Sequence, residues 1–412
     1  DKTVGAWTVS EEPATEAAAE TEEDETVSAW AVPEEPATEA AAQTEEDKTV
    51  GVWTQLLEAK TPESTPAPAP APEKAKKKNS SKKIAKIIIL AIVLILLIAL
   101  ACVMTVSGKH RSNPEQIQSY VTDNKYILDN TDISGHRSGG GIEPEETMLA
   151  FKNCAENPDF NIDVFEFDLH ITKDKQLVLL HDDTLDRTSN SEEVFGEKKV
   201  RPEDKTYDEL RTLNMGAKFE TEDGETPYAD LNDNVPDDLK ILKLNDILDY
   251  LIKQGGGKYK YIIEIKNGED LGKEGVDILY STLKEKGIVD KVVFGTFHKE
   301  VSAYVDEKYP DLARSTSIPE VLDFWKAALK DDEDYVPPCN VLQIPFCAPY
   351  KNLGINLGTA QMINYAHEHN MAVQYWTVND EDDMEYLIDM GADCIMTDYP
   401  DKLYNIKNNK DA

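Results

Sequence analysis

Glu166 and Asp168 stand two residues apart in the segment 164–168, which reads Val-Phe-Glu-Phe-Asp. In a β-strand, alternate side chains lie on the same face, so the two carboxylates should point in the same direction, with Val164 deeper on that face. Burying two carboxylates together costs free energy unless a cation neutralises them. A solvated acidic face on an edge strand gives the same pattern, so the neighbouring motifs decide between the two interpretations.

Before and after this pair, the chain contains three further polar motifs, His136-Arg137, His181-Asp182 and Glu264-Ile265-Lys266. With the pair, they provide hard oxygen ligands, two imidazoles and two cationic groups that can bind a phosphate. Cleavage of a phosphodiester requires one proton to leave the nucleophile and another to reach the departing alkoxide, and imidazole titrates near neutral pH. The combination therefore favours the site of a metal-assisted phosphodiesterase as the interpretation of Glu166 and Asp168, over a solvated acidic face on an edge strand.

Strand-like and helix-like segments alternate through the part of the chain that carries these motifs. The predicted strands are 164–169, 177–180, 259–265, 291–296, 341–344, 372–377 and 394–397, and the predicted helices include 244–253, 275–286 and 359–369. Repeated β–α units favour an α/β fold of the TIM (β/α)8 barrel type, whose sites lie at the C-terminal ends of the strands, where these motifs fall. An open doubly wound sheet is the alternative, but no Gly-rich dinucleotide loop supports it.

Residues 133–405 resemble the glycerophosphodiester phosphodiesterase family, whose fold is a TIM barrel. The motifs that carry the resemblance, in chain order, are Gly135-His136-Arg137, Pro144-Glu145-Glu146-Thr147, Phe165-Glu166-Phe167-Asp168, His181-Asp182-Asp183-Thr184-Leu185-Asp186-Arg187-Thr188, Glu264-Ile265-Lys266, Trp376-Thr377-Val378-Asn379 and Gly391-Ala392-Asp393 with Thr397-Asp398-Tyr399-Pro400. Each motif is weak alone, but their order and spacing are specific. The resemblance implies hydrolysis of glycerophosphodiesters to glycerol 3-phosphate and an alcohol.

The resemblance also implies a divalent cation. Glu166, Asp168 and Glu264 match the metal ligands of the family. Three carboxylates suit a hard cation, with phosphate, hydroxyl or water oxygens completing its shell. The family uses Ca²⁺ or Mg²⁺, and we expect Ca²⁺ because the domain is predicted to lie outside the cell.

Five further positions match functional residues of the family. His136 and His181 match its acid–base pair, and the sequence leaves open which is the acid. Arg137 and Lys266 match its phosphate contacts, because Arg offers a planar fork and Lys a compact charge. Trp376 is expected to form an apolar wall for the substrate, although an aromatic residue at a strand end can equally belong to the core. Direct attack by water and a cyclic phosphate intermediate both remain open.

Two positions depart from the family pattern. Ser138 stands where the family usually has Gly after His-Arg, and Glu146 stands where it usually has Asn in Pro-Glu-Asn-Thr. Neither change removes a catalytic group. We expect both to alter the shape of the loop beside the site.

The N-terminal part of the chain has a different composition. Residues 1–73 contain eighteen acidic residues and three lysines, a charge of about −15, and repeat with a period of 23 around Trp7, Trp30 and Trp53. Such a sequence cannot bury enough apolar surface to fold, so we expect a disordered acidic repeat followed by a Pro-rich linker. The repeats are interpreted as a duplicated spacer, or alternatively as an array of Trp motifs that bind a partner.

A membrane anchor is expected next. Residues 74–86 are basic, and residues 87–106 contain twenty uncharged residues, which is enough for one bilayer crossing. Positive charge before the span predicts a single-pass protein of the cell membrane with a cytoplasmic N-terminus, a linker over 107–132 and an extracellular catalytic domain.

The charge of the remaining chain argues against one class of partner. Residues 74–111 carry +9, and subtracting this and the −15 of residues 1–73 from the total of −36 leaves about −30 on residues 112–412. A domain so acidic is a poor candidate for binding nucleic acid. Two other functions remain as alternatives: a phospholipase acting on lysolipids or phosphoinositides, and a non-catalytic surface scaffold that uses the Trp repeats.

Overall fold

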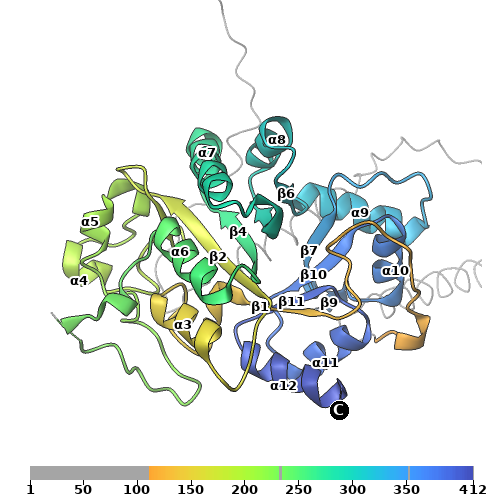
Figure 1. The fold of residues 1–412 in the computed structure, drawn as a ribbon, viewed down its shortest axis with the longest axis horizontal. Helices are drawn as coiled ribbons and strands as arrows, with labels where there is room; N and C mark the ends of the chain where they lie inside the picture. The colour runs from red at the N-terminus through yellow and green to blue at the C-terminus, as the bar shows by residue number, and fades with distance from the viewer. Residues whose placement is uncertain (1–110, 232–233, 351–352, 412) are drawn as a thin grey trace, which may run out of the picture. The chain divides into compact units, whose positions relative to one another are not determined.

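The structure, a computed structural model, describes residues 111–231, 234–350 and 353–411 (Figure 1). The predicted repeats, basic segment and membrane span over 1–106 lie outside the described residues. Among the residues that are described, no helix is both long enough and apolar enough to cross a bilayer.

Eight parallel strands form a nearly closed barrel, as the TIM-barrel prediction expects. In spatial order they are β6 (Ala313–Arg314), β5 (Val292–Gly295), β4 (Lys260–Ile265), β2 (Val164–Ile171), β1 (Asp132–Gly135), β11 (Cys394–Thr397), β10 (Ala372–Trp376) and β7 (Val341–Pro345). A parallel bridge from Ser315 to Val341 joins the two ends of this order. The alternative of an open doubly wound sheet is therefore wrong.

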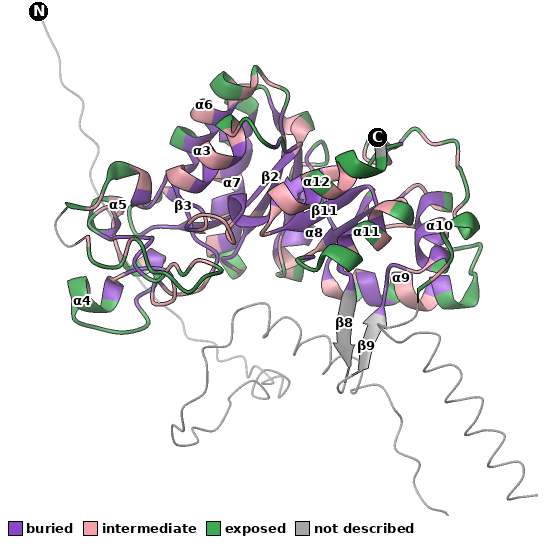
Figure 2. Cartoon of the chain, turned by 90° about the horizontal axis from the view of Figure 1, so that it is seen from below, coloured by how far each residue is buried: buried purple, intermediate pink, exposed green. Residues whose placement is uncertain are grey.

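Alternation along the strands separates the inside of the barrel from its outer surface. Val164, Ile262 and Val293 pack together with residues of β7 and β11 in one buried cluster. The intervening residues of β2 face outward, where the ring of Phe165 stacks on that of Phe151 at a centroid distance of 5.6 Å. Figure 2 shows the buried strands surrounded by helices that are half-exposed. Glu166 and Asp168 share the parity of Val164, so the fold directs them to the barrel axis.

Helices connect the strands around the outside of the barrel (Figure 1). They are α3 (Met148–Glu156), α6 (Leu244–Gly255), α7 (Glu269–Lys286), α8 (Lys299–Lys308), α9 (Ile318–Lys330), α10 (Ala360–Glu368), α11 (Glu381–Asp389) and α12 (Pro400–Asp411). A β-hairpin of β8 (Cys347–Tyr350) and β9 (Leu353–Asn356) follows β7. The alternation of strands and helices places every β–α loop at one end of the barrel.

One extension departs from the simple β–α alternation. The predicted strand at 177–180 forms β3 (Leu177–Leu179), which pairs antiparallel with β2 and lies outside the barrel. The chain then passes through α4 (Ser191–Phe195) and α5 (Tyr207–Leu210) before α6 begins. This extension has a small apolar core of its own. It carries His181 and Arg187 to the rim of the barrel.

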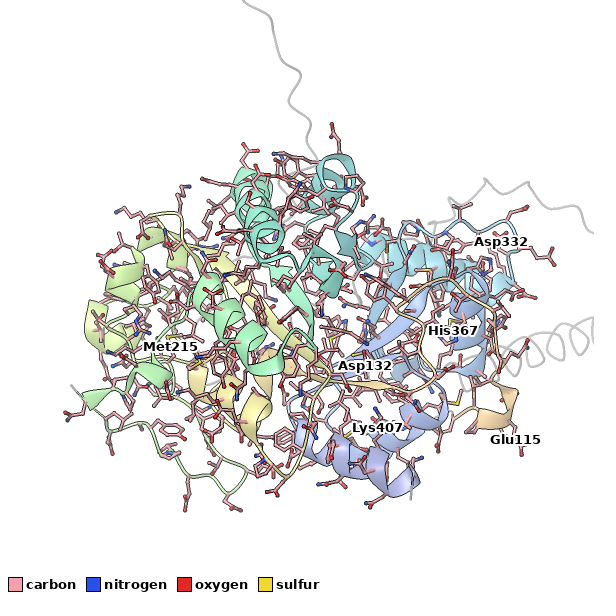
Figure 3. The ribbon with its side chains drawn as sticks, viewed as in Figure 1. Glu115, Asp132, Met215, Asp332, His367 and Lys407 are labelled. Atoms are coloured by element: carbon pink, nitrogen blue, oxygen red, sulfur yellow. The ribbon has the colours of Figure 1, made fainter. Side chains whose placement is uncertain are left out.

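The described part of the predicted linker packs against the barrel. Asn124 Nδ2 donates to the carbonyl oxygens of Asn340 and Asn370, both at 2.8 Å, and the Leu128 amide donates to Asp393 Oδ1 at 2.7 Å. These three acceptors lie within two residues of the starts of β7, β10 and β11. Lys407, which Figure 3 labels, donates from Nζ to the Thr131 carbonyl at 2.7 Å. Residues 124–131 thus lie against the N-terminal ends of strands, whereas Ser112 Oγ accepts a hydrogen bond from the Ala360 amide at the start of α10.

Candidate active site

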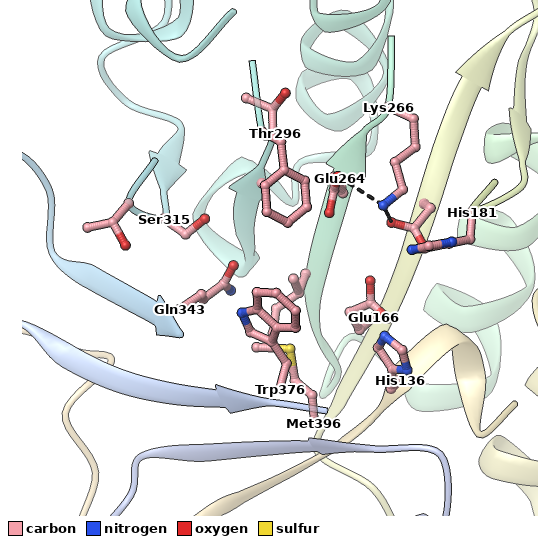
Figure 4. A pocket seen from close by; sticks show the side chains of 15 residues that line it. His136, Glu166, His181, Glu264, Lys266, Thr296, Ser315, Gln343, Trp376 and Met396 are labelled. Atoms are coloured by element: carbon pink, nitrogen blue, oxygen red, sulfur yellow. Dashed lines mark ion pairs between the residues drawn. The ribbon is translucent and has the colours of Figure 1, made fainter. Parts of the chain in front are cut away.

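A pocket opens at the C-terminal ends of the strands. Its lining residues are His136, Glu166, Asp168, His181, Ile262, Glu264, Lys266, Gly295, Thr296, Phe297, Ser315, Thr316, Gln343, Trp376 and Met396. Seven of the eight predicted site residues are among them, and the eighth, Arg137, has its Nε 3.9 Å from Asp168 Oδ2. The charged residues lie on one side of the pocket and the neutral ones on the other (Figure 4).

Two of the three carboxylates pair with Lys266, which directly follows β4, and the third accepts a backbone hydrogen bond. Lys266 Nζ lies 3.0 Å from Glu264 Oε1 and 3.2 Å from Asp168 Oδ1. Glu166 Oε2 accepts a hydrogen bond from the Arg137 amide at 2.7 Å. Burial and the nearby charge of Asp168 raise the pKa of Glu166 to about 8. Burial opposes ionisation of Asp168 as well, but Lys266 and the neighbouring cations lower its pKa to about 2.

The arrangement of the three carboxylates and Lys266 bears on the predicted metal site. Among the described residues, no group of three or more His, Cys, Asp or Glu side chains is arranged to hold a metal ion, and Lys266 links two of the three predicted ligands. The donor set nevertheless fits a divalent cation, because Glu166, Asp168 and Glu264 line the same pocket. Burial and the charge of Asp168 disfavour the ionised form of Glu166. A hard cation bound by these oxygens would favour that form.

The ring of His136 is held by Asp398, a residue near the C-terminal end of the sequence. Its Nδ1 lies 2.7 Å from Asp398 Oδ1, and its Nε2 lies 3.4 Å from Thr377 Oγ1. Asn379 Nδ2 in turn donates to Asp398 Oδ2 at 2.7 Å. Burial would lower the pKa of His136, but the carboxylate of Asp398 outweighs it and raises this pKa to about 9. This pair favours an imidazolium at neutral pH.

His181 also pairs with a carboxylate, but with the opposite result. Its Nδ1 lies 2.9 Å from Asp182 Oδ1. Arg187 binds the same carboxylate through Nε at 2.8 Å and Nη2 at 2.9 Å, so Asp182 shares its charge with a guanidinium. Burial, together with the charges of Lys266 and Arg137, keeps the pKa of His181 well below its usual value. A neutral imidazole results.

Arg187 also organises the phosphate side of the pocket. Its Nη1 and Nη2 donate to the two carboxylate oxygens of Glu145 at 2.8 and 2.6 Å. Glu145 lies 3.5 Å from Arg137 Nη1 and therefore links the two arginines. Despite burial of Glu145, Arg187 and Arg137 lower its pKa to about 2. The sequence prediction assigned no role to Arg187 or Glu145, although both belong to the motifs of the resemblance.

The two departures from the family pattern occupy special backbone positions. Ser138 and Glu146 have φ of +63° and +55°, in the left-handed region that favours Gly or Asn. Glu146 Oε1 accepts a hydrogen bond from the Asp168 amide at 2.6 Å. Burial and the charge of Asp168 raise the pKa of Glu146 well above its usual value. The extra carboxylate predicted beside the site is thus buried against β2.

Trp376 lies in the wall of the pocket. Its ring meets that of Phe297 edge to face, with centroids 6.1 Å apart. Both residues line the pocket on the side of β5 and β10. Trp376 is half-buried and combines both interpretations, because it lines the pocket and also packs against the buried cluster of Val164, Ile262 and Val293.

Comparisons with known proteins agree with this arrangement. A model described as the glycerophosphoryl diester phosphodiesterase family matches residues 136–402. A glycerophosphodiester phosphodiesterase of Caldanaerobacter subterraneus subsp. tengcongensis is 27% identical over 275 residues, covering 66% of this chain and 96% of the relative. One from Bacillus subtilis is 28% identical over 284 residues, covering 66% and 85%.

A solved structure shows the same fold. It is an Oleispira antarctica phosphodiesterase in complex with the product sn-glycerol-3-phosphate, with a TM-score of 0.52 and 20% identity. The match covers 68% of this chain and 97% of that one. The likeness extends over nearly all of that enzyme and over the barrel described above.

Proposed function

The chain belongs to the glycerophosphoryl diester phosphodiesterase family, and we propose that it cleaves glycerophosphodiesters to glycerol 3-phosphate and an alcohol, using a divalent cation and two histidines. The observation that carries this proposal is the pair of imidazoles on the charged side of one pocket, each held by a carboxylate at Nδ1. Because each Nδ1 is held by a carboxylate, we assign the proton transfer to Nε2 of each ring, which in His136 lies 3.4 Å from the Thr377 hydroxyl.

In this proposal the cationic residues of the site bind the phosphate and the carboxylates bind the divalent cation. Lys266 and Arg137 supply positive charge for the phosphate, and burial of both groups strengthens that attraction. When bound by Glu166, Asp168 and Glu264, a divalent cation would polarise a phosphoryl oxygen and neutralise the developing charge. We propose Ca²⁺ rather than Mg²⁺, because the domain is expected to lie outside the cell.

The two histidines take different roles in this proposal. Asp398 carries its charge next to His136 and also accepts a hydrogen bond from the neutral amide of Asn379, so His136 holds a proton and donates it to the leaving alkoxide. His181 remains neutral, because it is buried near the positive charges of Lys266 and Arg137, and it accepts the proton of the nucleophile. Environments that push two pKa values apart are the usual basis of an acid–base pair.

Asp398→Asn should move the alkaline limb of the pH profile to lower pH. His136 acts as the acid only while protonated, so activity falls as the pH rises through its pKa of about 9. Since the charge of Asp398 raises that pKa, its removal lowers it and activity is lost at a lower pH. Measuring kcat/KM against pH checks this, with Asp389→Asn on the surface of α11 as the matched control. An unchanged alkaline limb would contradict the assignment of His136.

The experiment that tests the function compares substrates. The full chain is incubated with glycerophosphoinositol, glycerophosphoglycerol, glycerophosphocholine or lysophosphatidylcholine, and the products are separated. We expect release of glycerol 3-phosphate from the water-soluble diesters. Turnover of lysophosphatidylcholine alone would favour the phospholipase alternative, and no turnover of any substrate would favour the scaffold.

A further inference from the structure

The side of the pocket opposite the histidines carries no charged residue. We call it the neutral wall, and it consists of Thr296, Phe297, Ser315, Thr316, Gln343 and Trp376. These residues come from the ends of β5, β6, β7 and β10. In Figure 4, Ser315, Gln343 and Trp376 face His136 and His181 across the pocket. The phosphate chemistry proposed above uses none of the hydroxyl or amide groups of this wall.

Gln343 is fixed in one orientation at the base of the wall. Its Nε2 donates to Oε1 of Gln374 at 2.8 Å, and the two residues are register partners on β7 and β10. Gln374 is 7% exposed and lies inside the barrel. Because one N–H of Nε2 is directed to Gln374, the carbonyl oxygen and the second N–H of Gln343 are the parts of the amide that a ligand can pair with. A carbonyl oxygen accepts hydrogen bonds, so it selects a group that donates one.

Two hydroxyl groups lie beside this amide. Thr316 is 8% exposed, and its Oγ1 has no hydrogen-bond partner among the described residues. Ser315 Oγ reaches only the Phe294 carbonyl, at 3.4 Å. Buried hydroxyls without good partners cost free energy, and a ligand hydroxyl that pairs with them recovers it. The wall is therefore suited to a ligand with several hydroxyl groups.

The aromatic residues of the wall do not make it a site for a quaternary ammonium group. Such a site needs an open aromatic face and benefits from a nearby carboxylate. Lys266 Nζ already lies 5.7 Å from the centroid of the Phe297 ring, so a second cation on this ring would be repelled. None of the residues that line this side of the pocket is a carboxylate. The rings of Phe297 and Trp376 instead offer apolar contact to the C–H groups of a polyol.

We propose that the neutral wall binds the alcohol that leaves the phosphate and selects uncharged polyols, such as glycerol or a cyclic polyol, over amino alcohols. The inference rests on the proposed function and adds the class of the second alcohol. Hydroxyl groups of the polyol would donate to Gln343 Oε1 and pair with Thr316 Oγ1. A choline ester offers no hydroxyl donor at that place, which leaves these buried polar groups unpaired.

The test compares diesters that differ only in the alcohol. For the full chain we expect kcat/KM to be at least about tenfold higher for glycerophosphoinositol or glycerophosphoglycerol than for glycerophosphocholine. Gln343→Glu places a carboxylate in the wall and should shift this ratio toward glycerophosphocholine by about tenfold or more. Gln343→Leu should lower kcat/KM for the polyol diesters and leave that for glycerophosphocholine nearly unchanged. Gln361→Glu on α10 is the matched control and should leave the ratio unchanged.

The outcomes separate this inference from the proposed function. A wild-type chain that hydrolyses glycerophosphocholine as well as the polyol diesters overturns the selectivity but keeps the phosphodiesterase. Gln343 variants that lower kcat/KM equally for all diesters also overturn it, because the wall would then hold the glycerol moiety common to every substrate. A chain that hydrolyses none of the diesters overturns the proposed function and this inference with it.

Discussion

Replacing His136 or His181 by Asn should lower kcat by about 10²–10⁴-fold, the range for removing a general acid or base. Asn keeps a polar side chain of similar reach but cannot exchange a proton near neutral pH. Both imidazoles are buried and aligned at Nδ1 by a carboxylate, so little reorganisation precedes proton transfer. KM should change little, because the proposed phosphate contacts, Lys266 and Arg137, remain.

Steady-state kinetics on a polyol diester give both constants. His369→Asn is the matched control, since this residue bonds only within the C-terminal turn of α10 and lies outside the pocket. Thermal unfolding of each variant separates loss of chemistry from loss of structure. A loss of less than about tenfold in folded His136→Asn and His181→Asn proteins would rule out the acid–base pair.

Removal of divalent cations should have a comparably large effect. A cation bound to the developing charge contributes several kcal/mol to the transition state, so chelation with EDTA should reduce turnover by about 10³-fold. We expect Ca²⁺ to restore activity more fully than Mg²⁺. Glu166→Gln and Asp168→Asn should weaken the response to added Ca²⁺, because each removes one charged oxygen ligand.

Glu146→Gln provides the control for these carboxylate changes. It removes a carboxyl group buried against the Asp168 amide without removing a proposed ligand, so the dependence on Ca²⁺ should persist. Turnover that is unchanged by EDTA in the wild-type chain would contradict a role for the cation. The ion pairs of Lys266 with Asp168 and Glu264 would then be the permanent state of the site.

The local pattern of β2 was sufficient to predict its part of the site. Alternation in 164–168 predicted that Glu166 and Asp168 share a face with Val164, and the structure places Val164 inside the barrel with both carboxylates in the pocket above. This worked because a strand buried on both sides has few ways to place two carboxylates. The regular alternation of strands and helices likewise predicted the barrel.

Elements with weak local patterns were harder to predict. Helix α7 begins at Glu269, six residues before the predicted start at 275, because glycines interrupt the helical pattern there. Gly272 is required by packing, since a Cβ atom at that position would lie 2.2 Å from the Asn267 carbonyl oxygen. Strand β6 contains only two residues, too few to give a periodic signal. Tertiary contacts, and not local sequence, define these elements.

The way in which carboxylates hold the two histidines could not be predicted from the sequence. Asp398 is 262 residues from His136, and although it stands in the motif Thr397-Asp398-Tyr399-Pro400, that motif does not show that its carboxylate pairs with His136. Asp182 adjoins His181 directly, yet its effect depends on Arg187. The difference between the two imidazoles, and hence their proposed roles, follows from the charges around each ring: Asp398 beside His136, and Lys266 and Arg137 near the buried His181. That information exists only in the folded chain.

The most direct test of the central claim is the identity of the phosphorylated product. The full chain with Ca²⁺ is incubated with glycerophosphoinositol, and the reaction is followed by ³¹P NMR. We predict that the diester signal is replaced by that of glycerol 3-phosphate, with free inositol released, and that EDTA prevents the change. Formation of an inositol phosphate with free glycerol, or a diester signal that persists in the presence of Ca²⁺, would contradict the proposed function.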